Sequence, residues 1–487
     1  MKRTYAVALV ILMLFGASLV TGCPAGGTGL GVLTPTQGGG PEPSASGGSA
    51  TPTASPSTTI LATGLNFPTG LRIARNSAGI ESLDEGIFFV DGFRVVQPNQ
   101  GNFKHVNASS THQTPVTFTL TDRNGATEGL TAPLEMDENT PAGTSTVTGV
   151  AGQSYFIGDR FTLTNQGRVV EICEIDKGTG RALLNDLTTS GAPGVTTNMG
   201  SLNNIVGITY AQASDGTEFV FFSEYQSGSN PGGRIGRITL GGTPTARTAV
   251  VETFMTNLAF PAHIDATTSR IVFAENNSTN PRYFAVDLQP EKADPPHPLP
   301  ITPNTSDVLV SFTGKSTDPQ LMQNPFDVVV LVDGFAGLNG FGFSFVGPST
   351  AGTNGGSLRH SQTETTGLSK AFMNLVKGPD GGTLALTNPV GLSAVYDSTA
   401  DPPEAHVFYL ESANSAATLR RTFFTNNSDQ TVTTSRDEIL LNSLRNPWET
   451  DTFYNPATNT DIIFLTDGSY DPVGNNQGSI IRVDAPR

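Results

Sequence analysis

Residues 65–71 read Leu-Asn-Phe-Pro-Thr-Gly-Leu, in which a leucine stands three residues ahead of a proline. The same spacing recurs along most of the chain at intervals of 56 to 72 residues. The further copies are Leu130–Pro133, Leu258–Pro261, Met322–Pro325, Leu386–Pro389 and Leu444–Pro447, with Leu202–Ile205 as a copy that lacks the proline. Self-similarity at such a period is typical of repeat proteins, in which each unit buries its apolar face against its neighbours. The chain is therefore expected to contain seven copies of one structural unit.

Each copy is followed by segments that are typical of β-strands. They are short, rich in aromatic and β-branched residues, and bounded by Gly, Asn, Asp and Ser. In six copies the second apolar run ends at a carboxylate, and these residues are Asp91, Asp159, Glu224, Glu275, Glu411 and Asp467. A carboxylate that recurs in every unit is best explained as an acceptor of backbone N–H bonds in the turn after the strand.

Four antiparallel strands per unit, repeated around an axis, predict an all-β fold of the β-propeller type. We expect seven blades, with six or eight as alternatives, because the second and fifth copies are irregular. The last unit ends after its third strand, and Thr59–Ala62 precedes the first unit. This N-terminal strand is expected to complete the last blade and to close the ring, which would remove exposed sheet edges.

The pattern resembles the NHL-repeat propellers and the related gluconolactonase-like propellers. In those families a Pro-x-Gly-aliphatic strand precedes an aliphatic-aromatic run that ends in Asp, and Pro68–Leu71 and Pro389–Leu392 match this element. The resemblance covers about residues 59–487. It implies a propeller fold. In gluconolactonase-like enzymes it also implies a divalent ion on the axis, held by Glu, Asn and Asp, that polarises a lactone carbonyl.

The amino terminus has the pattern of a secretory signal. Met1-Lys2-Arg3 is basic, and the apolar run Ala6–Val20 is too short for a membrane-spanning helix. It ends in Leu19-Val20-Thr21-Gly22-Cys23, which resembles the bacterial lipobox and implies cleavage before Cys23 and lipidation of that residue. Residues 1–23 are therefore predicted to be a lipoprotein signal peptide, and the protein is expected on the bacterial cell envelope. Pro24 favours the outer membrane.

Residues 24–58 consist almost wholly of Gly, Pro, Ser, Thr and Ala, a composition that cannot bury a core and predicts a disordered tether. Residues 59–487 are then the propeller. The formal net charge of −16 excludes nucleic acid as a partner and leaves the lipid anchor as the expected contact with the membrane. With Cys23 lipidated, Cys173 would be the one remaining thiol, and it is expected to be a buried apolar residue.

Residues just after the Leu-x-x-Pro element differ between copies, and they would begin the innermost strands at one mouth of the channel. Variation on a repeated scaffold is where function is expected. The candidate site residues are His263, Asp327, Asn388 and Glu449. They could form a site for a divalent cation such as Ca²⁺, with a polar channel that holds no ion as the favoured alternative.

No motif of nucleophilic, dinucleotide-dependent or zinc-dependent catalysis is present in the sequence. The leading hypothesis is therefore a non-catalytic binding or scaffold module for an envelope protein, a glycan or a small ligand. The alternative is a metal-dependent hydrolase or lactonase of the gluconolactonase-like type, with its site at the channel mouth. The sequence leaves the question of enzymatic activity open.

Overall fold

The structure is a computed structural model. It describes residues 55–76, 81–92, 100–139, 153–159, 167–225, 232–267, 269–275, 282–304, 309–314, 327–330, 343–347, 357–363, 371–375, 386, 389–397, 404–411, 417–426, 432–468 and 478–487. In these ranges the chain is all β apart from two 3₁₀ turns, η1 (Pro244–Ala246) and η2 (Pro290–Lys292). None of the described segments forms a helix with the length and apolar character needed to cross a membrane.

The long strands fall into antiparallel four-strand sets, numbered here in chain order. Set 1 is β2 (Pro68–Ile73), β3 (Ile87–Asp91), β4 (Asn102–Val106) and β5 (Val116–Thr117). Set 2 is β8 (Pro133–Glu138), β9 (Tyr155–Asp159), β10 (Arg168–Asp176) and β11 (Arg181–Asp186). Set 3 is β13 (Asn204–Gln212), β14 (Glu218–Tyr225), β15 (Gly233–Gly241) and β16 (Thr248–Leu258). Set 4 is β17 (Pro261–Ala266), β18 (Arg270–Glu275), β19 (Arg282–Asp287) and β20 (Leu309–Gly314).

Three further sets follow along the chain. Set 5 is β21 (Asp327–Val330), β22 (Phe343–Gly347), β23 (Ser357–Thr363) and β24 (Ala371–Leu375). Set 6 is β25 (Pro389–Asp397), β26 (Glu404–Glu411), β27 (Ala417–Asn426) and β28 (Val432–Leu444). Set 7 is β29 (Pro447–Asn455), β30 (Thr460–Asp467), β31 (Gly478–Pro486) and the N-terminal β1 (Ser57–Leu65). Three short strands, β6 (Thr119–Thr121), β7 (Thr127–Glu128) and β12 (Val195–Thr197), add to the outer edges of sets 2 and 3.

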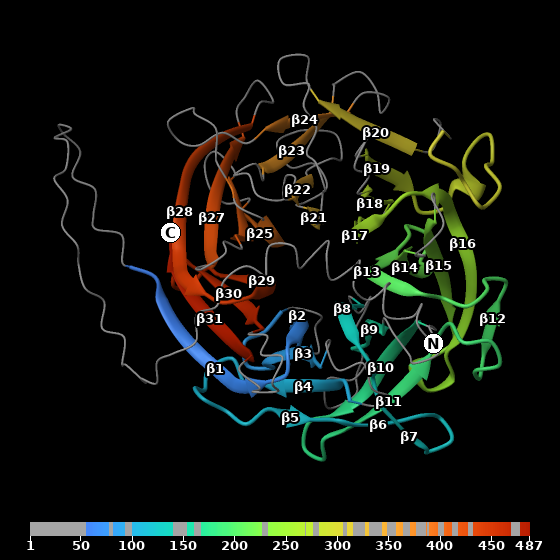
Figure 1. Ribbon diagram of the computed structural model, residues 1–487, viewed down its shortest axis with the longest axis horizontal. Coiled ribbons are helices and arrows are strands. Elements are labelled where there is room, and N and C mark those ends of the chain that lie inside the picture. The colour runs from blue at the N-terminus through green and yellow to red at the C-terminus, as the bar shows by residue number, and fades with distance from the viewer. Residues whose placement is uncertain are drawn as a thin grey trace, which may run out of the picture.

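The sets are arranged radially, with the first strand of each set nearest the centre (Figure 1). The predicted all-β propeller is therefore confirmed. The predicted number of seven separate blades is not confirmed. The described strands form six hydrogen-bonded sheets, because sets 4 and 5 share one eight-stranded sheet through parallel pairing of β20 with β24. A pairing between outer strands of different sets depends on long-range contacts, so the local strand pattern in the sequence does not predict it.

The recurrent carboxylates fasten the Leu-x-x-Pro turn to the second strand of the same set. Asp159 Oδ1 accepts the backbone N–H groups of Thr131 and Ala132 at 2.9 and 2.8 Å, and its Oδ2 accepts a bond from Arg168 Nε at 3.2 Å. Asp467 accepts the N–H of Asn446 at 2.7 Å in the same way. The bonded turn precedes the first strand of the set, whereas the sequence placed it after the second strand. Burial raises the pKa of Asp159, and Arg168 with the two amides opposes that rise.

The Leu-x-x-Pro turn also connects neighbouring sets, because its leucine pairs with the start of the third strand of the set before it. Gly101 N–H donates to Leu130 O at 2.8 Å, and Gly167 N–H donates to Leu202 O at 2.8 Å. Gly478 of set 7 pairs with Leu65 ahead of set 1 in the corresponding place. The contact that leads from set 1 to set 2 is thus found again between set 7 and set 1.

The core lies between adjacent sets, because successive residues of a strand point to opposite faces of their sheet. Phe88 packs with residues of set 2, such as Met136 and Tyr155, whereas Phe89 packs with Phe464 of set 7. Both phenylalanines are fully buried. Set 1 therefore buries apolar side chains on both faces, which explains why its second strand reads as a continuous apolar run.

Candidate functional site

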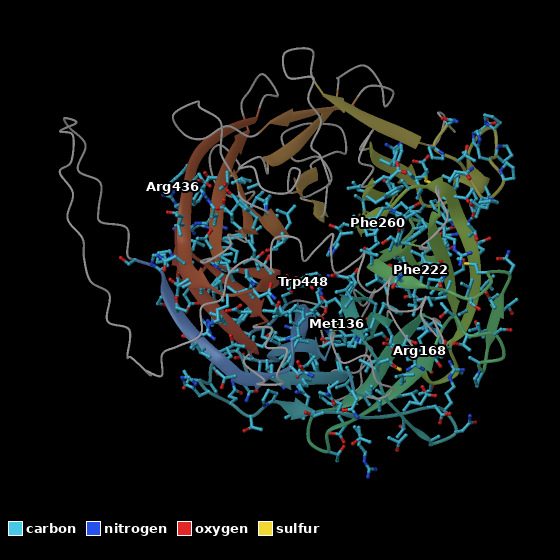
Figure 2. The ribbon with its side chains drawn as sticks, viewed as in Figure 1. Met136, Arg168, Phe222, Phe260, Arg436 and Trp448 are labelled. Atoms are coloured by element: carbon cyan, nitrogen blue, oxygen red, sulfur yellow. The ribbon has the colours of Figure 1, made fainter. Side chains whose placement is uncertain are left out.

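The first strands carry an irregularity at one common position, the second residue after the proline of the Leu-x-x-Pro element, or after Ile205 in the copy without a proline. We name this position the ring position. The residues at the ring position are Gly70, Glu135, Gly207, His263, Asp327, Gly391 and Glu449. In β2, β8, β13, β17, β25 and β29 the antiparallel register shifts at or next to this residue. Such β-bulges re-aim side chains next to functional sites. Met136 and Trp448, each next to a ring position, lie toward the middle of the ring (Figure 2).

Glycine at the ring position permits close approach of neighbouring first strands. Gly70 has φ +37°, and a Cβ atom there would lie 3.0 Å from Met136 N of β8. A Cβ atom at Gly207 would lie 2.8 Å from the Cα atom of His263 in β17. Real Cβ atoms essentially never show a contact as short as the one at Gly207, and the one at Gly70 is tighter than nine in ten real contacts, so a side chain at either position would press on the neighbouring strand. The Pro-x-Gly element is thus required by packing between the sets.

His263 and Glu135 contact each other across the glycine of the strand between them. His263 Nε2 of β17 lies 3.3 Å from Glu135 Oε1 of β8. Their side chains are 11% and 6% exposed, so the pair is shielded from water. In the ring, β13 stands between β8 and β17 (Figure 1). The residue at the ring position of β13 is Gly207, which carries no side chain. We attribute the direct contact between His263 and Glu135 to the space that this glycine leaves.

Arg72 connects the first strands of three consecutive sets. Its Nη1 donates to Glu449 of β29 at 2.5 Å, and its Nε donates to Asp137 of β8 at 3.3 Å. Burial alone would lower the pKa of Arg72, but the charges of Glu449, Asp137 and Asp451 outweigh it, and this pKa lies well above the usual value. Arg72 is therefore a permanent cation surrounded by carboxylates.

Two of these carboxylates also accept backbone amides from the neighbouring strand. Asp451 Oδ2 accepts the N–H of Ile73 at 2.8 Å, and Asp137 Oδ2 accepts the N–H of Tyr210 at 2.7 Å. The first strands β29, β2, β8 and β13 belong to four different hydrogen-bonded sheets. These side-chain-to-backbone bonds therefore take the place of a ladder between β29 and β2 and between β8 and β13.

A second cation, Arg75, lies two residues beyond the end of β2. It donates to Glu138 of β8 and, at 3.0 Å, to Glu81, and Gln153 Nε2 donates to Glu138 at 2.7 Å. Burial raises the pKa of Glu138 to about 7. Charge repulsion from Asp451 adds to this rise, and the positive charge of Arg75 opposes it. This carboxyl can take up a proton near neutral pH.

The structure separates two of the predicted site residues. His263 pairs with Glu135, whereas Glu449 pairs with Arg72. Asp327 begins β21, where only the backbone is described, and Asn388 and the predicted lipid attachment residue Cys23 lie outside the described residues. His263, Asp327, Asn388 and Glu449 remain predictions as a ligand-binding set.

A divalent ion does not fit the described side chains. Within the described ranges no group of three or more His, Cys, Asp or Glu residues is arranged to hold a metal. Glu449 is already bound by the guanidinium of Arg72, and a fixed cation at 2.5 Å repels a second one. The axial-metal arrangement of the gluconolactonase-like enzymes is therefore not reproduced by the residues that the structure describes.

Sequence reasoning missed Glu135, Arg72, Asp137 and Asp451. Glu135 stands at the ring position of its copy, and the other three stand four residues after Pro68, Pro133 and Pro447. Listing the second and fourth residues after each proline would have found all four.

No family model and no curated protein matches this sequence. Among solved structures, the chain is similar to a glucose dehydrogenase-type oxidoreductase of Thermus thermophilus, with 11% identity and a TM-score of 0.40, over 88% of this chain and 99% of that one. A second structure, named glucose dehydrogenase, has 10% identity and a TM-score of 0.36, over 88% of this chain and 100% of that one. A levansucrase mutant of B. megaterium has 10% identity and a TM-score of 0.34, over 74% of this chain and 83% of that one.

Proposed function

We propose that the protein is a non-catalytic binding module of a bacterial cell envelope, attached by lipid at Cys23, that holds a partner at the end of the propeller where the ring positions lie. The observation that carries this proposal is the mutual pairing of charged groups on the first strands. Arg72 is held by Glu449 and Asp137, and His263 by Glu135. A general base or nucleophile must be directed at a substrate, whereas these groups are directed at each other.

The ligand class follows from the balance of charge. The second and fourth positions after the prolines carry the acids Glu135, Asp137, Asp265, Asp327, Glu449 and Asp451, with Arg72 and His263 as the basic residues. An excess of carboxylates repels anions and favours neutral or cationic ligands. We therefore propose a neutral glycan, or a protein with a neutral or basic surface, as the partner.

The finer architecture belongs to the same proposal. We take each four-strand set as one blade, so that the eight-stranded sheet counts as two blades and the ring has seven. The pairing of β1 with β31, from Ser57 opposite Asp484 to Leu65 opposite Gly478, supports closure of the ring by the N-terminal strand. The tether of residues 24–58 and the lipobox at Cys23 support attachment to the membrane, with the outer membrane as the proposed location.

The binding proposal is tested with an array of neutral, anionic and cationic glycans at neutral pH and low salt. We expect binding among the neutral members, with at least a tenfold loss in Glu135→Gln and no loss in Gly200→Ala, because no atom lies within 4 Å of a Cβ at Gly200. Binding confined to anionic members, or equal binding by both variants, would contradict the site.

The attachment proposal has its own test. In the native host, Cys23→Ser is expected to move the protein from the membrane fraction to the soluble fraction. Pro24→Ser, which leaves the lipobox cysteine in place, is the matched control and should stay with the membrane. If Cys23→Ser remains bound to the membrane, the lipid anchor is wrong.

The alternative is a metal-dependent hydrolase or lactonase centred on His263, Asp327 and Glu449. One observation favours it, namely that these three residues and Glu135 share the ring position of their sets. Metal analysis and lactone hydrolysis by the purified protein separate the two functions. A stoichiometric divalent ion that is lost in His263→Ala, together with lactone hydrolysis, would favour the enzyme over the binding module.

A further inference from the structure

A buried cluster of charged side chains joins set 6 to set 7. Its members come from β26, β27 and β30 and from the residue that follows β31, and they are His406, Arg421, Asp461 and Arg487. His406 and Asp461 are fully buried, and Arg421 is 1% exposed. Burying a charge is costly unless a partner compensates it, so the contacts within this cluster decide whether the junction holds. None of the four residues stands at a ring position.

Asp461 is the centre of the cluster. Its Oδ2 lies 2.6 Å from His406 Nδ1 and accepts a bond from Arg421 Nη1 at 2.9 Å. Its Oδ1 accepts a bond from Arg487 Nε at 2.9 Å. Burial would raise the pKa of Asp461, but the contacts with His406 and Arg487 outweigh burial and hold this pKa below its ordinary value. Asp461 is therefore an ionised carboxylate.

The cluster holds the end of β31, the strand that pairs with β1. Arg421 of β27 donates to Ala485 O at 3.0 Å and to Pro486 O at 2.8 Å. Both Arg421 and Arg487 are bound to Asp461. The position of Asp461 therefore affects how firmly set 6 holds β31, and with it the pairing of β31 with β1.

His406 of β26 faces a carboxylate with each of its two ring nitrogens. Nδ1 lies 2.6 Å from Asp461 Oδ2, and Nε2 lies 3.2 Å from Glu404 Oε2. The contact with His406 is the main reason why the pKa of Glu404 is lowered, so this carboxyl is ionised as well. An ionised carboxylate only accepts hydrogen bonds, and a neutral imidazole has one N–H. Both carboxylates can be bonded only if both nitrogens of His406 carry a proton.

The other charged groups near His406 come from β27 and β28. Arg421 Nε donates to Glu438 of β28 at 2.6 Å, and Arg436 lies 3.4 Å from the same carboxylate. The guanidinium of Arg436 lies 3.9 Å from the ring centroid of Phe423, which His406 meets edge-on at 4.3 Å between centroids. The two arginines oppose a positive charge on His406, but Glu438 pairs with both of them. The imidazole nitrogens themselves face carboxylates.

We propose that His406 is a buried imidazolium in the folded protein, and that its two N–H groups make the junction of sets 6 and 7 a pH-sensitive latch on β31. When the ring loses one proton, a bare nitrogen lies against a carboxylate oxygen, and an attractive contact becomes a repulsive one. The change is transmitted through Asp461 to Arg421 and Arg487, the two residues that hold the end of β31. The inference does not depend on the proposed ligand.

The latch has a limit on each side of the pH scale. On the acid side it is lost only when Asp461 and Glu404 take up protons, and their lowered pKa values place this limit below the ordinary range of carboxyl groups. On the alkaline side it is lost as His406 releases a proton, because the neutral ring can donate to only one of the two carboxylates. The junction is thus firmest in weakly acid solution and loosens as the pH rises.

The first test is NMR of the full chain in detergent, with ¹⁵N-labelled histidine, at about pH 6. Both ring nitrogens of His406 are expected to give the signals of N–H groups. His105 is the matched control, because it is also buried, but its Nε2 lies 2.7 Å from the carbonyl of Glu85, and burial lowers its pKa to about 4. It should show one N–H and one bare nitrogen. A bare nitrogen on His406 at this pH overturns the proposal.

The second test is hydrogen exchange in β31, corrected for the intrinsic effect of pH on exchange. Between about pH 6 and pH 9 we expect protection of the β31 amides to fall at least tenfold relative to β15 of set 3. The fall should disappear in His406→Gln, which has no charge to lose, and persist in His105→Gln. An equal fall in both strands shows a general loosening, and a fall that persists in His406→Gln shows that another group controls the junction. Either result overturns the latch.

Discussion

Arg72 and Glu449 are 377 residues apart in the chain, yet their side chains form an ion pair at 2.5 Å. The pair connects set 1 with set 7, and Asp137 extends it into set 2. Because the side chains of Arg72 and Glu449 are only 22% and 9% exposed, removing the cation leaves a poorly hydrated carboxylate without its partner. The bond contributes to holding the two ends of the sequence together.

Arg72→Met is expected to lower the free energy of unfolding by about 3 kcal/mol, because breaking one side of a buried pair strands the other charge. Urea denaturation measures the change. Lys292→Met is the control, since the pair of Lys292 with Asp215 is largely exposed and contributes little to stability. Equal losses in the two variants would show that Arg72 is no more than a surface residue.

Gly207→Ala is expected to destabilise the protein by about 1–3 kcal/mol, the usual cost of overpacking. Its new Cβ would stand 2.8 Å from the Cα atom of His263 and would move β17 away from β13. Thermal unfolding measures the effect, and Gly200→Ala, with no atom within 4 Å of its Cβ, should be close to neutral. A neutral Gly207→Ala would disprove the close approach of the two first strands.

Glu138 predicts a dependence of stability on pH. Burial raises its pKa to about 7 from 4.5, so the folded state binds this proton more tightly than the unfolded state does. The unfolded state then holds fewer protons between these two values, and the free energy of unfolding falls as pH rises through that window. In Glu138→Gln this contribution is absent, and the difference in unfolding midpoint between about pH 5 and pH 7 should shrink. Parallel pH curves for wild type and variant would refute the assignment.

Cys173 is expected to be unreactive in the folded protein. It is buried in β10, Asn185 Nδ2 lies 3.5 Å from its sulfur, and burial raises its pKa, so little thiolate is present. A thiol-specific reagent at neutral pH should label it only after urea is added. Rapid labelling in native buffer would mean that the interface of sets 2 and 3 opens readily.

Much of the fold could be predicted from the sequence, because its information is local and repeated. The apolar run expected to end at Asp91 is β3, which ends at that residue, and Thr59–Ala62 lies within β1. The six-sheet arrangement could not be predicted, since the pairing of β20 with β24 joins two outer strands by contacts that no strand pattern encodes.

The candidate site was harder to predict, because its contacts pass between sets. His263 was identified from variation between copies, but its partner Glu135 follows from the empty place at Gly207 in the intervening strand. The pairing of Glu449 with Arg72 depends on β29 standing beside β2, which is a property of the ring as a whole. The residue types at the repeated positions indicated candidate site residues, and the arrangement of the sets determines which of these residues are in contact.

The pairing of β1 with β31 has a consequence for how the protein is made. Among the described strands, β1 stands first in the chain, and its partner β31, at residues 478–486, stands last. β31 must therefore be synthesised before β1 can pair with it, and until then the edge of β1 and the apolar face of Leu61 and Leu65 stay open to chaperones. The sheet of set 7 can therefore form only late in synthesis, after the strands of the other sets have been made.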